Sequence, residues 1–92
     1  MSRTPTHEIV RLLEQSMVDA VCQRSPEDKR EVQTLDLNIN FMQSAIGPLH
    51  ASAQVIGGGK TMCFCEGRVL DAQGALVAQG MGTLRRGEGA WA

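Results

Sequence analysis

The sequence has almost no net charge, no long apolar run and no metal-binding spacing. Nine lysines and arginines stand against ten aspartates and glutamates, which leaves a formal charge of −1. Such a chain has no global field to hold a polyanion or an anionic surface, so we expect no nucleic acid and no membrane among its partners. No apolar run approaches the roughly 18 residues of a membrane span, and the N-terminus lacks the apolar core of a signal peptide. We therefore expect a cytoplasmic protein.

The spacing of the cysteines and histidines argues against a disulfide and against a metal site. Cys63 and Cys65 stand two residues apart on one strand face, a spacing that does not make a normal disulfide. We expect all three thiols to be free and to act as small buried apolar groups. There is no C-x-x-C or H-x-x-x-H spacing, and only His7 and His50 add imidazoles. We expect no metal site.

The length of the chain predicts one domain that needs help from a partner. At 92 residues and 9.9 kDa, residues 1–92 form a single unit. A chain of this size buries only about 60–65% of its unfolded surface, so its stability is modest. We expect association with a second copy.

Periodicity predicts one helix followed by strands. Thr4-Pro5 opens a helix over residues 5–23. The residues of its core-facing side recur at helical spacing: Ile9, Leu12, Leu13, Ser16, Met17 and Ala20. Polar and apolar residues then alternate strictly over residues 34–41, which is typical of a strand with one buried face. We expect Leu35, Leu37, Ile39 and Phe41 to face the helix residues Leu12, Leu13 and Met17.

Turn residues divide the rest of the chain into four strands, over about 32–42, 48–56, 60–71 and 75–85. Short loops of this kind join neighbouring antiparallel strands. The expected fold class is therefore α+β, with one long helix packed on a four-stranded antiparallel meander sheet.

Three polar features have simple structural interpretations. Residues 57–61, Gly-Gly-Gly-Lys-Thr, end like a phosphate-binding loop, but Gln54 stands where that loop needs glycine and a strand follows, so we expect a glycine hairpin. If residues 57–59 form its turn, His50 pairs with Glu66 across the strands. The strand-end cations Lys60, Arg85 and Arg86 are expected to be solvated.

Glu14 is the most promising candidate for catalysis. On a helix it falls beside Val10, Val18 and Val21, with His7 further along the same stripe. The apolar surface of this helix is then too wide for one sheet to cover, so we expect a second chain to cover the rest. That chain would partly remove the Glu14 carboxylate from water, which favours general-base chemistry. The alternative is that Glu14 borders the core and extends to water.

From Val32 onward the sequence resembles hotdog-fold thioesterases of the phenylacetate-pathway acyl-CoA type. The residues that carry the resemblance are 33–42, 67–80 and 82–84. The stretch 12–16, Leu-Leu-Glu-Gln-Ser, is similar to the family's helix segment with an acidic general base or nucleophile, which maps onto Glu14. Family members carry a first strand and a His-Gly-Gly turn before this helix, whereas Pro5-Thr6-His7 stands here, so the sequence looks like a hotdog truncated at its N-terminus.

The resemblance implies an acyl-CoA thioester hydrolase-like protein, homodimeric or tetrameric, with Glu14 and His7 as catalytic candidates. Coenzyme A enters as part of the substrate, not as a separate cofactor, and its phosphates run toward Gly58, Gly59 and Lys60. The alternative is a non-catalytic homo-oligomeric hotdog module for binding or assembly. A third possibility, a protease inhibitor, rests on the resemblance of residues 54–58, Gln-Val-Ile-Gly-Gly, to the cystatin hairpin.

Overall fold

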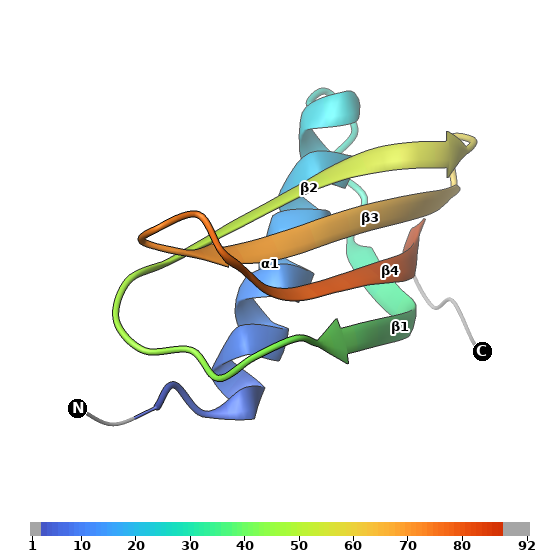
Figure 1. Ribbon diagram of the computed structural model, residues 1–92. Helices are drawn as coiled ribbons and strands as arrows, with labels where there is room; N and C mark the ends of the chain where they lie inside the picture. Colours follow the sequence, from blue (N-terminus) through green and yellow to red (C-terminus); the bar gives the residue numbers. More distant parts are fainter. Residues whose placement is uncertain (1–2, 88–92) are drawn as a thin grey trace.

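One helix lies across one face of a four-stranded antiparallel sheet in the computed structural model, which describes residues 3–87 (Figure 1). The elements in chain order are α1 (Thr6–Arg24), β1 (Val32–Phe41), β2 (Leu49–Gly58), β3 (Met62–Asp71) and β4 (Leu76–Arg86). The prediction of a helix packed on an antiparallel sheet is confirmed.

The order of the strands in the sheet is β1-β4-β3-β2, so β1 and β2 form the two edges. Strands β2, β3 and β4 follow one another as a meander, as predicted. The expected place of β1 beside β2 is wrong, because β1 pairs with β4 from Val32–Arg86 to Phe41–Ala78. The connection over residues 42–48 is long enough to carry the chain from one edge of the sheet to the other (Figure 1).

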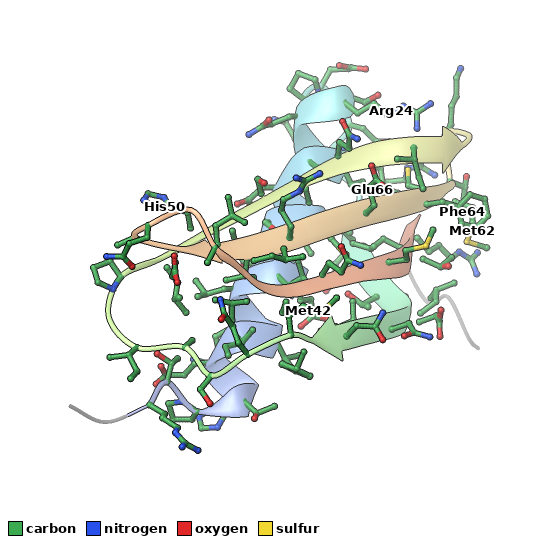
Figure 2. The ribbon with its side chains drawn as sticks, in the orientation of Figure 1. Arg24, Met42, His50, Met62, Phe64 and Glu66 are labelled. Atoms are coloured by element: carbon green, nitrogen blue, oxygen red, sulfur yellow. The ribbon has the colours of Figure 1, made fainter. Side chains whose placement is uncertain are left out.

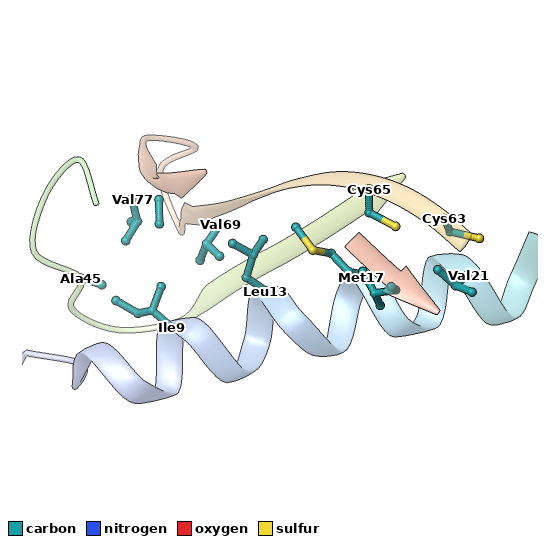
Figure 3. Close-up of a cluster of buried hydrophobic side chains, with 11 residues drawn as sticks. Ile9, Leu13, Met17, Val21, Ala45, Cys63, Cys65, Val69 and Val77 are labelled. Carbon is teal, nitrogen blue, oxygen red and sulfur yellow. The ribbon is translucent and has the colours of Figure 1, made fainter. Parts of the chain in front are cut away.

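The core is a row of helix side chains seated on the sheet (Figure 3). Ile9, Leu13, Met17 and Val21 recur every four residues and are all buried. Leu13 comes very close to the backbone of β3 and β4, since a Cβ atom on Gly67 would lie 2.7 Å from its Cδ1 atom and one on Gly80 would lie 3.2 Å from its Cδ2 atom. These two glycines let the helix approach the sheet closely.

Part of the predicted core is wrong. Leu12 is 39% exposed and Phe41 is 47% exposed, whereas Leu37 and Ile39 pack against the core. Since β1 is an edge strand, its far end lies beyond the surface that α1 covers. Phe41 instead lines a small hollow at the start of the helix.

The β2–β3 hairpin turns later than predicted. Gly57 and Gly58 belong to β2, and the turn lies over residues 59–61. Gly58 has φ +102°, and a Cβ atom there would collide with the carbonyl oxygen of Met62. The register therefore places His50 opposite Leu70, and Glu66 opposite Gln54. The predicted His50–Glu66 pair is wrong, and Gln54 Nε2 donates to Glu66 Oε1 at 2.6 Å instead.

The two ends of α1 also differ from expectation. Pro5 is the N-cap residue with extended backbone, and the helix begins at Thr6. At the other end, Arg86 is only 2% exposed, so its predicted place in solvent is wrong. Its guanidinium donates to the carbonyl oxygens of Val21, Ser25 and Asp28. A buried cation at carbonyl oxygens is favourable because the helix dipole is negative there.

The cysteines follow the prediction only in part. Cys63 and Cys65 are buried and free, whereas Cys22 is free but exposed on α1. Burial raises the pKa of the Cys65 thiol, which keeps it protonated and unreactive. Over residues 3–87, no helix has the length and apolar character needed to cross a membrane.

Candidate functional site

Glu14 lies in the middle of α1, directly after the fully buried Leu13. It is half-buried, and so are Val10 and Val18, which flank it at spacings of four residues. Within residues 3–87 its carboxylate takes part in no hydrogen bond or ion pair with another side chain. Glu14 therefore stands at the border of the buried face, with its acceptor oxygens available to a ligand or to a second chain.

His7 lies on the first turn of α1 and is exposed. It is seven residues before Glu14, which at 1.5 Å per residue separates the two by about 10 Å along the helix axis. The two side chains share a stripe, as predicted, but they are not hydrogen-bonded partners in one protomer.

Gly58, Gly59 and Lys60 form the exposed end of the β2–β3 hairpin. This hairpin lies beside the C-terminal end of α1, because Arg30 Nη2 from the α1–β1 connection donates to the carbonyl oxygen of Lys60 at 3.0 Å. The hairpin and the first turn of α1 are therefore at opposite ends of the molecule, roughly a helix length of about 25 Å apart. One protomer therefore does not bring His7, on this first turn, together with the predicted coenzyme-binding residues.

Helix α1 and the edge strand β2 run in the same direction. Leu13 lies over Gly67 of β3, which pairs with Ala53 of β2. Met17, one helix turn later, lies over Gly82 of β4. Gly82 pairs with Cys65 of β3, which in turn pairs with Val55, two residues further along β2. The helix also starts where β2 starts, since the amide of Thr4 donates to the carbonyl oxygen of Ala45. The N-terminal half of α1 therefore lies at the first residues of β2, and the hairpin lies at its last.

The start of α1 offers backbone donors of its own. The amides of Glu8 and Ile9 donate to the carbonyl oxygen of Pro5 at 3.0 and 3.4 Å. The amides of Thr6 and His7 precede them in the first turn, where helix N–H groups have no partner within the helix. A hollow of about 320 Å³ adjoins this turn and is lined by Thr6, Ile9 and Phe41, among others.

Within the described part of the chain, no three histidine, cysteine, aspartate or glutamate residues gather where they would hold a metal ion. The groups that the candidate site offers are one half-buried carboxylate, the backbone amides at the start of α1 and the cation of Lys60.

Solved structures establish the class of fold. The BH2602 protein of Bacillus halodurans, whose crystal structure contains CoA, matches with a TM-score of 0.84 and 29% identity over 91% of this chain and 59% of its own. A thioesterase-superfamily protein matches with a TM-score of 0.82 and 30% identity over 90% of this chain and 61% of its own. This chain is therefore a hotdog-fold protein of the kind found in the thioesterase superfamily, and the resemblance noted from the sequence is confirmed.

A further solved structure shares the fold at lower sequence identity. The PaaI protein of E. coli, from the phenylacetic acid degradation operon, has the same fold with a TM-score of 0.80 at 19% identity, over 91% of this chain and 59% of that protein. This chain thus spans about 60% of the length of each of these three structures. No family model and no curated protein matches the sequence.

Proposed function

We propose that this chain hydrolyses an acyl-CoA thioester in a site shared by two protomers, with Glu14 as the general base. The observation that carries the proposal is the half-buried, unpaired carboxylate of Glu14 on the central helix of a hotdog fold. The similarity to BH2602, which was crystallised with CoA, supports the class of substrate.

The direction of α1 and β2 supports a site that is shared between two protomers. Strand β2 is an edge strand, and an exposed edge pairs readily with another strand. Two copies of β2 paired antiparallel about a two-fold axis bring the hairpin of each copy to the first residues of the other copy's β2. Gly58, Gly59 and Lys60 of one copy then lie beside the half of the partner's α1 that carries His7 and Glu14. The ammonium of Lys60 meets the phosphates of the coenzyme there.

Each group in this site has a defined task. Glu14 takes a proton from a water molecule, whose oxygen forms a bond to the thioester carbonyl carbon. The carbonyl oxygen gains negative charge and accepts hydrogen bonds from the amides of Thr6 and His7. The carbon–sulfur bond then breaks, the electron pair leaves with the coenzyme sulfur, and the proton held by Glu14 passes to that sulfur. The products are a carboxylic acid and a free thiol, so the step consumes one water.

The test is a thioesterase assay over short, aromatic and long acyl-CoAs with wild type, Glu14→Gln and Glu8→Gln. Glu8 is an exposed carboxylate on the first turn of the same helix, so it is the matched control. We expect Glu14→Gln to lower kcat by about 10²–10⁴-fold, the usual contribution of a general base, and Glu8→Gln to change it little. Melting followed by circular dichroism is expected to be the same for all three proteins. Equal rates for wild type and Glu14→Gln would contradict the proposal.

The start of the helix favours a second candidate, a non-catalytic homo-oligomeric binding or assembly module. Pro5 has no N–H group, and Thr6 and His7 carry side chains where glycine lets a ligand approach the backbone closely. This module binds CoA or its own copies without turnover. It predicts that wild type hydrolyses none of the acyl-CoAs and that Glu14→Gln is at least as stable as its parent.

A further inference from the structure

Two exposed cations, Arg30 and Lys60, lie together at the end of the molecule that carries the β2–β3 hairpin. Figure 2 shows this end, where Met62 begins β3, and His50 at the far end of the sheet. Arg30 belongs to the connection between α1 and β1, and Lys60 belongs to the turn of the hairpin. The two residues are in contact, because Arg30 Nη2 donates to the carbonyl oxygen of Lys60 at 3.0 Å.

The carboxylate of Asp28 holds the Arg30 guanidinium in one orientation. Arg30 Nε donates to Asp28 Oδ1 at 3.1 Å, and Arg30 Nη2 donates to Oδ2 at 2.8 Å. Two parallel hydrogen bonds of this kind fix the plane of a guanidinium as well as its position. The backbone of Asp28 is itself held by the buried Arg86, whose Nη1 donates to the Asp28 carbonyl oxygen at 2.7 Å. Through Asp28, the Arg30 side chain is therefore anchored to the end of β4.

The turn that carries Lys60 is fixed as well. The amide of Gly59 donates to the carbonyl oxygen of Met62 at 2.7 Å. The amide of Arg86 donates to the carbonyl oxygen of Thr61 at 2.7 Å. The contact of the neighbouring guanidinium with the Lys60 carbonyl oxygen is the third. The backbone of Lys60 thus has a defined place, whereas its ammonium stands on a flexible stem that can follow a ligand.

Both cations keep donors that the described part of the chain does not use. Asp28 occupies the Nε and Nη2 edge of Arg30, but Nη1 makes no hydrogen bond within residues 3–87. Over the same residues the ammonium of Lys60 has no hydrogen bond and no ion pair. Glu31 is exposed and pairs with neither cation there. Two adjacent cations with unused donors favour the binding of an anion between them.

The number of charges favours a phosphate monoester as this anion. A monoester carries a charge of about −1.5 to −2 at pH 7 and has three acceptor oxygens, so it can accept from a guanidinium and an ammonium at once. Each phosphate of a pyrophosphate bridge carries a single charge. Coenzyme A contains one such bridge and, on its ribose, one phosphate monoester. The monoester is therefore the group of this coenzyme that matches two cations.

We propose that Arg30 and Lys60 together bind the ribose phosphate of coenzyme A, with Arg30 as a specificity-determining residue. This assignment rests on the proposed function, which brings the coenzyme to the hairpin, but it concerns binding and not the chemical step. Its consequence is a narrower class of substrate. The site selects thioesters of coenzyme A over thioesters of dephospho-CoA or of a bare pantetheine arm, because those carriers lack the ribose phosphate.

The test is isothermal titration calorimetry of the full chain with CoA and with dephospho-CoA, which lacks only the ribose phosphate. We expect wild type to bind CoA at least about tenfold more tightly than dephospho-CoA, since hydrogen bonds between charged groups are strong. Arg30→Met and Lys60→Met are each expected to lower this preference several-fold. The double variant Arg30→Met/Lys60→Met is expected to bind the two ligands almost equally. Affinity for dephospho-CoA is expected to change little throughout, because the lost contacts are to the ribose phosphate.

Two further variants separate this role from a structural one. Lys29→Met removes an exposed cation from the same connection and is expected to keep the wild-type preference. Arg30→Lys keeps the charge but lacks the planar fork that binds Asp28 and the Lys60 carbonyl oxygen together, so we expect an intermediate preference. If Arg30 only braced the hairpin, Arg30→Met would weaken both ligands equally and leave the preference unchanged, which overturns the assignment. Equal effects of Lys29→Met and Arg30→Met overturn it too.

Failure of this assignment can be told apart from failure of the proposed hydrolase activity. A wild type that hydrolyses an acyl-CoA but binds CoA and dephospho-CoA equally overturns the assignment alone. A wild type that prefers CoA, and loses this preference in the double variant, supports the assignment even when it hydrolyses no thioester. Absence of CoA binding overturns the assignment, as does a preference for CoA that survives in the double variant.

Discussion

Arg86 donates from Nη2 to the carbonyl oxygen of Val21 at 2.7 Å, and so the last residue of β4 binds the last turn of α1. The same guanidinium reaches the carbonyl oxygens of Ser25 and Asp28 at 3.2 and 2.7 Å. Carbonyl groups at a helix end have no partner within the helix. The buried side chain of Arg86 therefore supplies hydrogen-bond donors to the carbonyl groups at the end of α1 and connects this end of the helix to the sheet.

Replacing this residue is expected to be costly. Arg86→Met keeps much of the side-chain volume but leaves buried carbonyl oxygens without donors, so we expect the free energy of unfolding to fall by about 3–5 kcal/mol. Urea unfolding measures this loss. Arg11→Met, at an exposed position on α1, is the control and is expected to change stability by less than about 0.5 kcal/mol. Equal losses for the two variants would contradict the role of Arg86.

Asp28 makes stability depend on pH in the acid range. Hydrogen bonds from Arg30 hold the pKa of the Asp28 carboxyl well below its usual range, and Arg86 adds an ion pair at 3.7 Å. A lowered pKa in the folded state means that the carboxylate stabilises the fold above the ordinary aspartate pKa of about 4, and that this stabilisation is lost as pH falls below it. Asp28→Asn is therefore expected to be less stable than wild type at pH 7, with a difference that shrinks as the pH is lowered through this range. Urea unfolding from pH 7 to pH 2 measures the difference. Asp19→Asn is the control, and its difference from wild type is expected to be smaller throughout.

The helix and the strands were predictable because their signals are local. The spacing of Ile9, Leu13 and Met17 and the alternation over residues 34–41 need no knowledge of the rest of the chain. The pairing of β1 with β4 was not predictable, because it joins segments on either side of two other strands. The burial of Arg86 was missed for a related reason, since its partners are backbone carbonyls at the end of a distant helix.

The candidate site was predictable to a similar extent. The border position of Glu14 follows from helix periodicity alone. Its distance from Lys60 does not, because it depends on which end of the sheet the hairpin occupies.

The corrected core predicts a clear contrast between two large apolar residues. Leu13 is fully buried between Gly67 and Gly80, so Leu13→Ala is expected to lower the free energy of unfolding by about 3–5 kcal/mol. Phe41 is the larger residue but is about half exposed, so Phe41→Ala is expected to cost less than about half as much. Thermal and urea unfolding of the two variants give the comparison. A larger loss at Phe41 would mean that a partner chain covers the end of β1.

A site shared by two protomers predicts that two inactive variants restore activity when they are mixed. Glu14→Gln removes the base, and Lys60→Glu repels the phosphates of the coenzyme from the hairpin, so each homodimer has two defective sites. In a mixed dimer, the Glu14 of the Lys60→Glu chain lies beside the Lys60 of the Glu14→Gln chain, and one of the two sites is intact. With random exchange half of the dimers are mixed, so we expect about a quarter of wild-type activity. The measurement is acyl-CoA hydrolysis after co-expression of differently tagged chains, with native mass spectrometry to count mixed dimers. If mixed dimers form and remain inactive although wild type is active, each site lies within a single protomer, and the hairpin of the partner has no part in it.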